Sequence, residues 1–252
     1  MPTTARAWPA RWSPSPTDFA PRSWEGAGSI PPYRDKIRRF NLPKPAGDTP
    51  HDRGEFLVTA LIPVKPLARS KSRLSSHLDL ARRTQLTHDS LRHVVHTLRS
   101  VPRIGDIVII SRDPQVAEWA AHWHVAHMRE RQRGLNAALR EARAQYASAA
   151  AILILPSDLV ALSATDVCAL LEAAHQAGDR CVVIAPDRHG RGTNALLLRP
   201  PGLIEFEFGR NSAARHAQRA LAQGVQPIWF RSDSICLDLD SPDDLELYLD
   251  QW

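Results

Sequence analysis

Three aspartates lie in sequence contexts that suit metal chemistry. Asp158 follows an apolar segment in LPSDL, while Asp238 and Asp240 alternate with leucines in LDLDSPDDL. Side chains two residues apart on a strand project from the same face, so the alternating pair is expected to lie side by side. Two such carboxylates repel each other unless a cation lies between them, and oxygen ligands of this kind suit Mg²⁺ bound together with substrate phosphates.

Helix capping is the competing interpretation of the acidic residues. Asp158 could cap a following helix, and its local sequence leaves the two explanations balanced. Ser241 or Asp240 could cap a final helix, whose dipole Asp243 and Asp244 would favour. We assign the dipole role to the last two residues and prefer metal binding for the alternating pair.

A basic loop follows the first predicted strand. PVKPLARSKSRLS, residues 63–75, carries four basic side chains, which are Lys65, Arg69, Lys71 and Arg73. The lysines are the only two after residue 55, so they indicate a need for compact point charges, as at a phosphate. A solvated basic loop is the competing explanation, and the loop has no P-loop motif. Because ligands of open α/β sheets bind beyond the carboxyl ends of the strands, we predict phosphate binding here.

A glycine-containing loop and a later turn indicate a second anion site. In APDRHGRGTNAL, residues 185–196, the glycines would let backbone N–H groups approach an anion, and Thr193 adds a hydroxyl. In FGRNSAARH, residues 208–216, Ser212 is the expected N-cap of a helix whose N-terminus favours phosphate. His216 is explained equally well as a packing residue or as part of this site.

The elements that carry these residues alternate between strand and helix. Apolar runs with strand character are followed by segments with apolar residues at helical spacing. This alternation predicts an α/β domain with a mostly parallel sheet covered on both faces. The predicted strands are residues 56–64, 106–111, 124–128, 151–156, 181–186, 195–200, 226–230 and 235–240. The predicted helices are residues 80–100, 114–123, 134–147, 165–177, 212–223 and a last one from 242.

The N-terminal part differs in composition from the rest. Half of the 20 prolines lie in the first 50 residues, so residues 1–54 are predicted to be a disordered extension and residues 55–252 one domain. Residues 1–55 hold nine basic and six acidic side chains, which leaves only +2 of the net charge of +5 for the remainder. A nearly balanced domain favours a small anionic ligand over nucleic acid.

The composition also indicates the cellular compartment of the protein. Three cysteines at wide spacings fit neither a disulfide framework nor a zinc site. No apolar run reaches the roughly 18 residues that span a bilayer. We therefore predict a cytoplasmic protein that contacts no membrane.

Six segments, taken in order, resemble the 2-phospho-L-lactate guanylyltransferase (CofC) family over residues 56–252. They are PVKPLARSKSRL, RGLNAAL, LPSDL, APDRHGRGTNALLLRPP, FGRNSAARH and LDLDSPDDL. The resemblance implies a single Rossmann-like nucleotidyltransferase domain of the nucleotide-diphospho-sugar transferase type. It implies Mg²⁺-dependent transfer of GMP from GTP to a small phosphorylated hydroxy acid, with release of pyrophosphate, in coenzyme F-420 biosynthesis. The oligomeric state stays open, with a homodimer among the alternatives.

The resemblance also implies roles for individual residues. The acids that bind Mg²⁺ would be Asp158, Asp238 and Asp240. The groups that bind the acceptor would be Thr193, Gly209 and Ser212. The groups at the nucleotide would be Lys65, Arg69, Lys71, Arg73, Gly134 and Asn136. The catalytic groups would be Lys65, Lys71, Asp158 and Asp240.

Two positions depart from the family pattern. Val160 stands where proline is frequent, and Ala213 stands where an aromatic residue is frequent, next to the acceptor pocket. The acceptor therefore stays open among 2-phospho-L-lactate, phosphoenolpyruvate and 3-phosphoglycerate.

Two other functions compete with guanylyl transfer. One is a nucleotide-sugar glycosyltransferase, whose D-x-D motif is expected after a central strand. The other is a basic nucleic-acid-binding protein, suggested by the pI of about 9.5.

Overall fold

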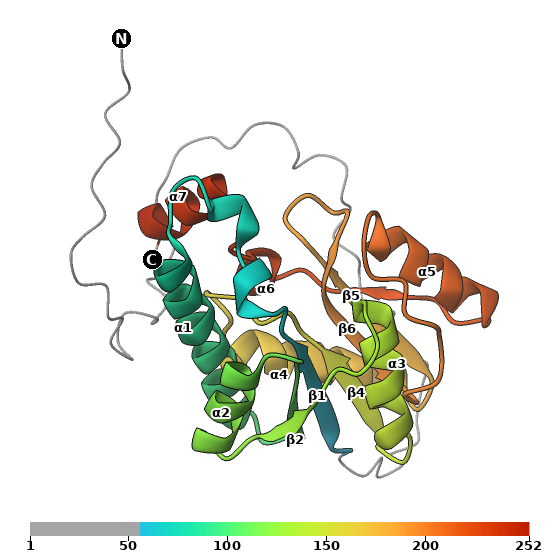
Figure 1. Ribbon diagram of the computed structural model, residues 1–252. Coiled ribbons are helices and arrows are strands. Elements are labelled where there is room, and N and C mark those ends of the chain that lie inside the picture. The colour runs from blue at the N-terminus through green and yellow to red at the C-terminus, as the bar shows by residue number, and fades with distance from the viewer. Residues whose placement is uncertain (1–55, 252) are drawn as a thin grey trace, which may run out of the picture. The chain divides into compact units, whose positions relative to one another are not determined.

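The computed structural model describes residues 56–251, which form a seven-stranded sheet with helices on both faces (Figure 1). The strand order is β3-β2-β1-β4-β6-β5-β7. β6 is antiparallel to both of its neighbours, and every other pair is parallel, which confirms the predicted mostly parallel sheet. The extension predicted over residues 1–54 lies outside the described residues. The strands are β1 (Val58–Pro63), β2 (Ile104–Ile110), β3 (Ala126–Met128), β4 (Ala151–Ile154), β5 (Cys181–Pro186), β6 (Thr193–Arg199) and β7 (Ile228–Trp229).

The helices begin at the polar residues that the sequence supplies. Asp79 and Ser163 accept hydrogen bonds from the N–H groups of Arg82 and Asp166, which lack partners within their helices. None of the helices in residues 56–251 is long and apolar enough to cross a membrane. The helices are α1 (Leu80–Arg99), α2 (Pro114–His122), α3 (Leu135–Gln145), α4 (Ala164–Ala177), α5 (Ser212–Ala222), α6 (Asp233–Cys236) and α7 (Pro242–Gln251), with short 3-10 turns η2 (Leu67–Arg69) and η3 (Ser72–Leu74).

The core has two layers, one on each face of the sheet. On β1, Ala60 and Ile62 pack into the layer that contains α1, α2 and α4, while Leu61 packs into the layer that contains α3 and α5. All three side chains are fully buried. Strands buried on both faces read as continuous apolar runs, which is why the central strands were visible in the sequence.

One predicted strand is wrong. Residues 235–240 were expected to form a strand, but α6 ends at Cys236 and the chain continues to Asp240 without joining the sheet. The leucine–aspartate alternation has strand period, yet its backbone groups are bound elsewhere. The Leu239 N–H donates to the Asp158 carbonyl at 3.1 Å, and the Asn194 amide donates to the Ile235 and Cys236 carbonyls.

Candidate active site

One edge of the sheet gathers most of the residues expected at the site. β1 ends at Pro63 and β4 at Ile154, so the basic loop and Asp158 leave the sheet at the same edge. Because β6 runs in the opposite direction, it begins at this edge, where Thr193 pairs with Pro186 at the end of β5. Reversal of a single strand therefore places a hydroxyl near the acidic and basic residues.

Lys71 joins three of the motifs found in the sequence. Its Nζ donates to Asp158 Oδ2 at 2.9 Å and also to the Leu239 carbonyl oxygen. The lysine side chain is only 2% exposed, whereas that of Asp158 is 22% exposed. A buried ammonium requires a counter-charge and further hydrogen bonds, and these two contacts supply both. The contact holds the basic loop, LPSDL and LDLDSPDDL together.

The other basic residues of the loop remain near solvent. Lys65 and Arg69 are exposed, and Arg73 pairs with Asp240 at 2.8 Å while 72% of its side chain is exposed. The loop itself is fixed to α1, because the Arg83 guanidinium donates to the Ser70 carbonyl at 2.8 Å. The predicted basic site is thus one buried ammonium and three exposed basic side chains on an anchored loop.

Asp238 and Asp240 lie in different surroundings. Asp238 Oδ1 accepts a hydrogen bond from the Asn194 amide at 3.1 Å, and Asp240 is bound by Arg73. Burial, together with the negative charge of Asp158, raises the pKa of Asp238 to about 6. The pairing of Asp238 with Asp240 was predicted from strand geometry, which is absent here. The charge that acts most on Asp238 is that of Asp158.

These carboxylates fit a hard cation only in part. Within residues 56–251 no group of three or more His, Cys, Asp or Glu side chains is arranged to hold a metal ion. The negative charge of Asp158 nevertheless disfavours the ionised form of Asp238, and a cation between the two carboxylates would relieve this repulsion. Magnesium is commonly held by one or two carboxylates with substrate phosphates and water, so a two-carboxylate donor set suits it.

A second cluster contains hydroxyl groups and a histidine. Thr193 Oγ1 lies 2.9 Å from Ser212 Oγ and 3.1 Å from His216 Nδ1. His216 Nε2 accepts the Glu207 N–H at 3.0 Å. His216 is fully buried, and this burial lowers its pKa to about 4. The packing interpretation of His216 is correct, but its two ring nitrogens also connect the hydroxyl pair to the chain before α5.

The turn before α5 depends on unusual backbone conformations. Gly209 has φ of +126°, and a Cβ atom there would lie 3.3 Å from Arg215 Nη2. The expected N-cap is wrong by one residue, because Asn211 occupies that position with φ of 55° and makes no side-chain cap bond. Ser212 is the first residue of the helix, so its hydroxyl is available to Thr193.

The glycine loop binds a carboxylate from its own chain. Asp187 Oδ1 accepts the Arg191 N–H, and Asp187 Oδ2 accepts the Gly192 N–H, each at 2.8 Å. A Cβ atom at Gly192 would meet Asp187 Oδ2 at 2.6 Å, which explains the glycine. The prediction that these N–H groups face an external anion is therefore wrong, since Asp187 already satisfies them.

Comparison with known proteins agrees with this arrangement. Residues 58–250 match the family model described as guanylyl transferase CofC like. The phosphoenolpyruvate guanylyltransferase of Rubrobacter xylanophilus is 45% identical over 190 residues, which cover 75% of this chain and 91% of that protein. The 2-phospho-L-lactate guanylyltransferase of a Methanocaldococcus species is 31% identical over 189 residues, covering 75% and 79%.

This chain belongs to the CofC-like guanylyltransferase family. It is therefore a nucleotidyltransferase, as the order of its motifs predicted. The fold agrees: a solved 4-diphosphocytidyl-2C-methyl-D-erythritol synthase superposes with a TM-score of 0.54 at 17% identity, covering 77% of this chain and 97% of that one. The predicted nucleotidyltransferase-like α/β fold is confirmed.

Two residues expected near the nucleoside in this guanylyltransferase have backbone roles. Asn136 donates from Nδ2 to the Phe208 carbonyl at 3.0 Å, and its Oδ1 accepts the Phe208 N–H at 2.9 Å. Gly134, with φ of +109°, precedes α3 and donates its N–H to Glu130 at 3.3 Å. Asn136 thus clamps the start of α3 to the turn before α5, a role that its sequence position did not reveal.

The acids near the C-terminus divide as expected. Ser241 Oγ accepts the Asp244 N–H at 3.3 Å, and Asp244 Oδ2 accepts the Ser241 N–H at 2.7 Å, so the two residues form a capping box for α7. Arg188 holds the other oxygen of Asp244 at 2.6 Å. Asp240 is not the cap, and its carboxylate pairs with Arg73 instead.

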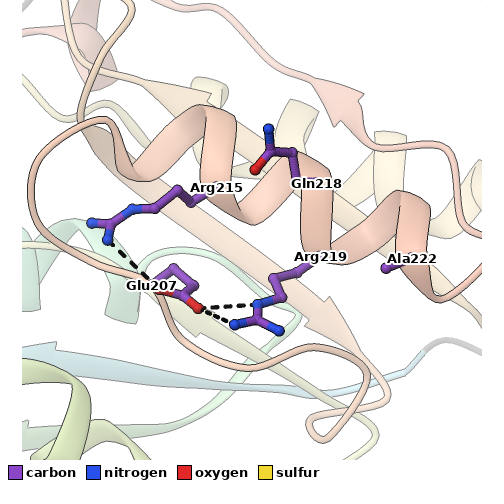
Figure 2. Close-up of a pocket in the computed structure, with 5 residues that line it drawn as sticks. All are labelled: Glu207, Arg215, Gln218, Arg219 and Ala222. Carbon is purple, nitrogen blue, oxygen red and sulfur yellow. Dashed lines mark hydrogen bonds and ion pairs between the residues drawn. The ribbon is translucent and has the colours of Figure 1, made fainter.

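A hollow of about 330 Å³ lies along α5, beside Glu207 (Figure 2). Arg219 Nε donates to Glu207 Oε1 at 3.0 Å, and Arg215 pairs with the other carboxylate oxygen at 3.7 Å. Because the charge of Glu207 is compensated and no aspartate lines the hollow, we do not place the reaction there. It is lined by Glu207, Arg215, Gln218, Arg219 and Ala222.

Proposed function

We propose that this chain transfers the guanylyl group of GTP to phosphoenolpyruvate and releases pyrophosphate, as a step in coenzyme F-420 biosynthesis. The observation that carries the proposal is the contact of buried Lys71 with Asp158, beside Asp238, at the sheet edge where the hydroxyl pair also lies. Phosphoenolpyruvate is chosen among the three acids because the more similar of the two relatives is named for it.

The proposed reaction needs no general base. A phosphate oxygen of the acceptor is already anionic at neutral pH and attacks the α-phosphorus of GTP in line. The new bond joins that oxygen to the α-phosphorus, while the bond to the β-phosphate breaks and its electrons leave with pyrophosphate. The main barrier is repulsion between two anions, so the chain has to supply positive charge and fixed hydrogen-bond donors.

The basic loop would supply the charge. Lys65 is exposed at the start of the loop and can approach the triphosphate, Lys71 would add its positive charge from its fixed position against Asp158, and Arg69 and Arg73 are exposed on the surface. Asp158 and Asp238, with Asp240 beside them, would hold Mg²⁺, which when bound neutralises phosphate charge and polarises the α-phosphoryl group. Lys71 also pairs directly with Asp158.

The second cluster would hold the acceptor. Thr193 and Ser212 offer hydroxyl groups. Gly209 has no side chain that would cover its backbone in the turn before α5. Hydroxyl and backbone donors suit a carboxylate or phosphate group that must stay nucleophilic, because they orient its oxygens without neutralising them as strongly as a cation would.

The proposal is tested by a product assay with purified protein. Mg²⁺ and GTP are supplied with phosphoenolpyruvate, 2-phospho-L-lactate or 3-phosphoglycerate separately, and products are read by mass while pyrophosphate is measured in a coupled assay. We expect a guanylylated phosphoenolpyruvate and stoichiometric pyrophosphate. Product with another acid alone would correct the acceptor, and no product with any of the acids would contradict the proposal.

A sugar-nucleotide control separates the remaining enzyme class. A glycosyltransferase on a similar sheet would consume a nucleotide sugar and release a nucleoside diphosphate, not pyrophosphate. We expect no turnover of GDP- or UDP-sugars with any of the three acids. The family match already favours nucleotidyl transfer, and this control tests the purified protein for glycosyltransferase activity.

A further inference from the structure

The hydrogen bonds around His216 have a defined direction. A backbone N–H can only donate, so the Glu207 N–H, 3.0 Å from His216 Nε2, requires a lone pair on that nitrogen. The proton of the neutral ring is then on Nδ1, which lies 3.1 Å from Thr193 Oγ1. His216 must therefore donate to Thr193, and not accept from it.

This direction leaves one hydroxyl proton without a partner in the cluster. Thr193 and Ser212 share a single contact of 2.9 Å, in which one hydroxyl donates to the other. Because His216 also donates to Thr193, it cannot accept the remaining O–H of the pair. That O–H therefore has to donate to an acceptor atom outside the cluster. All three side chains are at least nine-tenths buried, so an acceptor atom that receives this proton would be bound strongly.

The histidine is held firmly enough to impose this direction. Its ring packs edge-on against Phe208, with ring centroids 4.8 Å apart. Phe208 is in turn clamped by Asn136, and Glu207 is fixed through its carboxylate to Arg215 and Arg219 on α5 (Figure 2). Phe208 and Glu207, which both contact the ring, are thus each anchored, the first to α3 and the second to α5.

We propose that His216 is a positioning residue for the reaction: it directs the hydrogen bonds of Thr193 and Ser212 so that the one remaining O–H of the pair donates to an anionic oxygen of the acceptor. This inference rests on the proposed function and goes beyond it, because His216 acts through Thr193 and does not touch the substrate. Burial also disfavours the charged imidazolium, which would give up the lone pair that the Glu207 N–H requires.

Two substitutions test the hydrogen bonds of the two ring nitrogens separately. In His216→Asn the side-chain amide reaches the position of Nδ1 and can donate to Thr193. In His216→Gln it reaches the position of Nε2 and can accept from Glu207, but the donor to Thr193 is lost. We expect KM for the acceptor to rise about tenfold or more in His216→Gln and by less than about threefold in His216→Asn, with KM for GTP unchanged in both.

The controls distinguish positioning from general damage. Each variant loses one buried hydrogen bond, so both should lose similar thermal stability, and a purely structural role would change their acceptor KM values equally. Equal KM values, or a parallel rise in KM for GTP, would overturn the proposal. Thr193→Val should raise acceptor KM at least as much as His216→Gln, and combining the two should add little because they remove the same interaction.

A second measurement needs no turnover. Nitrogen-15 NMR of imidazole-labelled protein reports which ring nitrogen carries the proton, and the signals lost in His216→Asn assign this residue. We expect a neutral ring with the proton on Nδ1 at pH 7. A proton on Nε2, or a charged ring, would overturn the inference even if guanylyl transfer is observed. Absence of transfer with the expected tautomer would instead contradict the proposed function alone.

Discussion

The two proposed substrate-binding regions of this guanylyltransferase are built from different kinds of side chain. The region around Lys71, Asp158 and Asp238 is a set of charges, partly open to water, in which one ammonium is buried against one carboxylate. The side chains of Thr193, Ser212 and His216 in the other region are neutral and at least nine-tenths buried. The first can offset a triphosphate, whereas the second can only orient an oxygen.

This difference suits two substrates with different demands. Transfer requires charge neutralisation on the GTP side, where negative charge develops on the leaving pyrophosphate. On the acceptor side, strong neutralisation would weaken the attacking oxygen. Charged groups are therefore expected to control turnover, and neutral donors to control acceptor binding. The predictions that follow test this division, beginning with the largest effect.

Asp158→Asn should have the largest effect on turnover. The amide keeps the shape of the carboxylate but loses its charge, so kcat should fall by about a hundredfold to a thousandfold, as on loss of one preorganised electrostatic group. The free energy of unfolding should fall by about 1–3 kcal/mol, because Lys71 remains buried beside a weaker acceptor. Steady-state kinetics and urea denaturation measure the two effects.

Its control is the double variant Lys71→Met, Asp158→Asn. Replacing both partners of a buried pair by uncharged groups of similar size is often close to neutral for stability. The double variant should therefore recover stability without recovering activity. Near-normal turnover in Asp158→Asn would contradict the assignment of this acid to the reaction.

Asp238 should make stability depend on pH in the metal-free protein. Its pKa rises from 3.8 in the reference state to about 6 in the folded protein, chiefly through burial, so the folded state binds the proton more tightly. The free energy of unfolding should therefore fall as pH rises from about 4 to about 6, by at most about 3 kcal/mol. In Asp238→Asn this decrease should disappear.

Thermal or urea unfolding in the presence of a chelator measures this effect. The stability difference between Asp238→Asn and the parent protein should grow across that pH window and stay constant above about pH 7. A difference that is the same at pH 4 and pH 7 would show that Asp238 titrates normally and lies outside the charged region.

Thr193→Val should raise acceptor KM by about tenfold while leaving KM for GTP unchanged, because it removes a hydroxyl that the neutral region uses for orientation. Thr193→Ser keeps the hydroxyl and serves as the matched control, with a change of less than about threefold. Initial rates with each substrate varied in turn measure both constants. Equal rises in both KM values would remove the distinction between the regions.

Arg73→Ala should have the smallest effect. The Arg73–Asp240 pair is largely exposed, so its loss should change the free energy of unfolding by less than about 1 kcal/mol. Any rise in KM for GTP should shrink as salt is increased, because exposed charges are screened. An effect that salt does not alter would place Arg73 in the buried part of the site.

The sequence predicted the elements better than the local contacts of the site. Strands buried on both faces, such as β1 and β4, are continuous apolar runs, and their positions follow from that pattern alone. The strand expected at residues 235–240 failed because alternation records only local periodicity. Whether a segment joins a sheet depends on distant partners, here the Asp158 carbonyl and the Asn194 amide.

The same limit applies to the side chains of the site. The motifs brought Lys71, Asp158 and Asp238 to attention, but nothing local showed that the lysine would be buried against one of them. A closer signal existed for Asp187, an acid that precedes a glycine-rich loop and takes up its N–H groups. The backbone conformation of Asn211 could likewise have been predicted, since asparagine tolerates the left-handed region found there.

The reversed direction of β6 has a consequence for divergence within this fold. Because β5 and β6 form a hairpin closed by Asp187, the groups at the acceptor side arrive on one contiguous stretch that continues into α5. The basic loop and Asp158 belong to an earlier stretch of the chain. A change of acceptor at the proposed site can therefore arise from substitutions within this one stretch, provided that Asn194, which donates to Asp238, is retained.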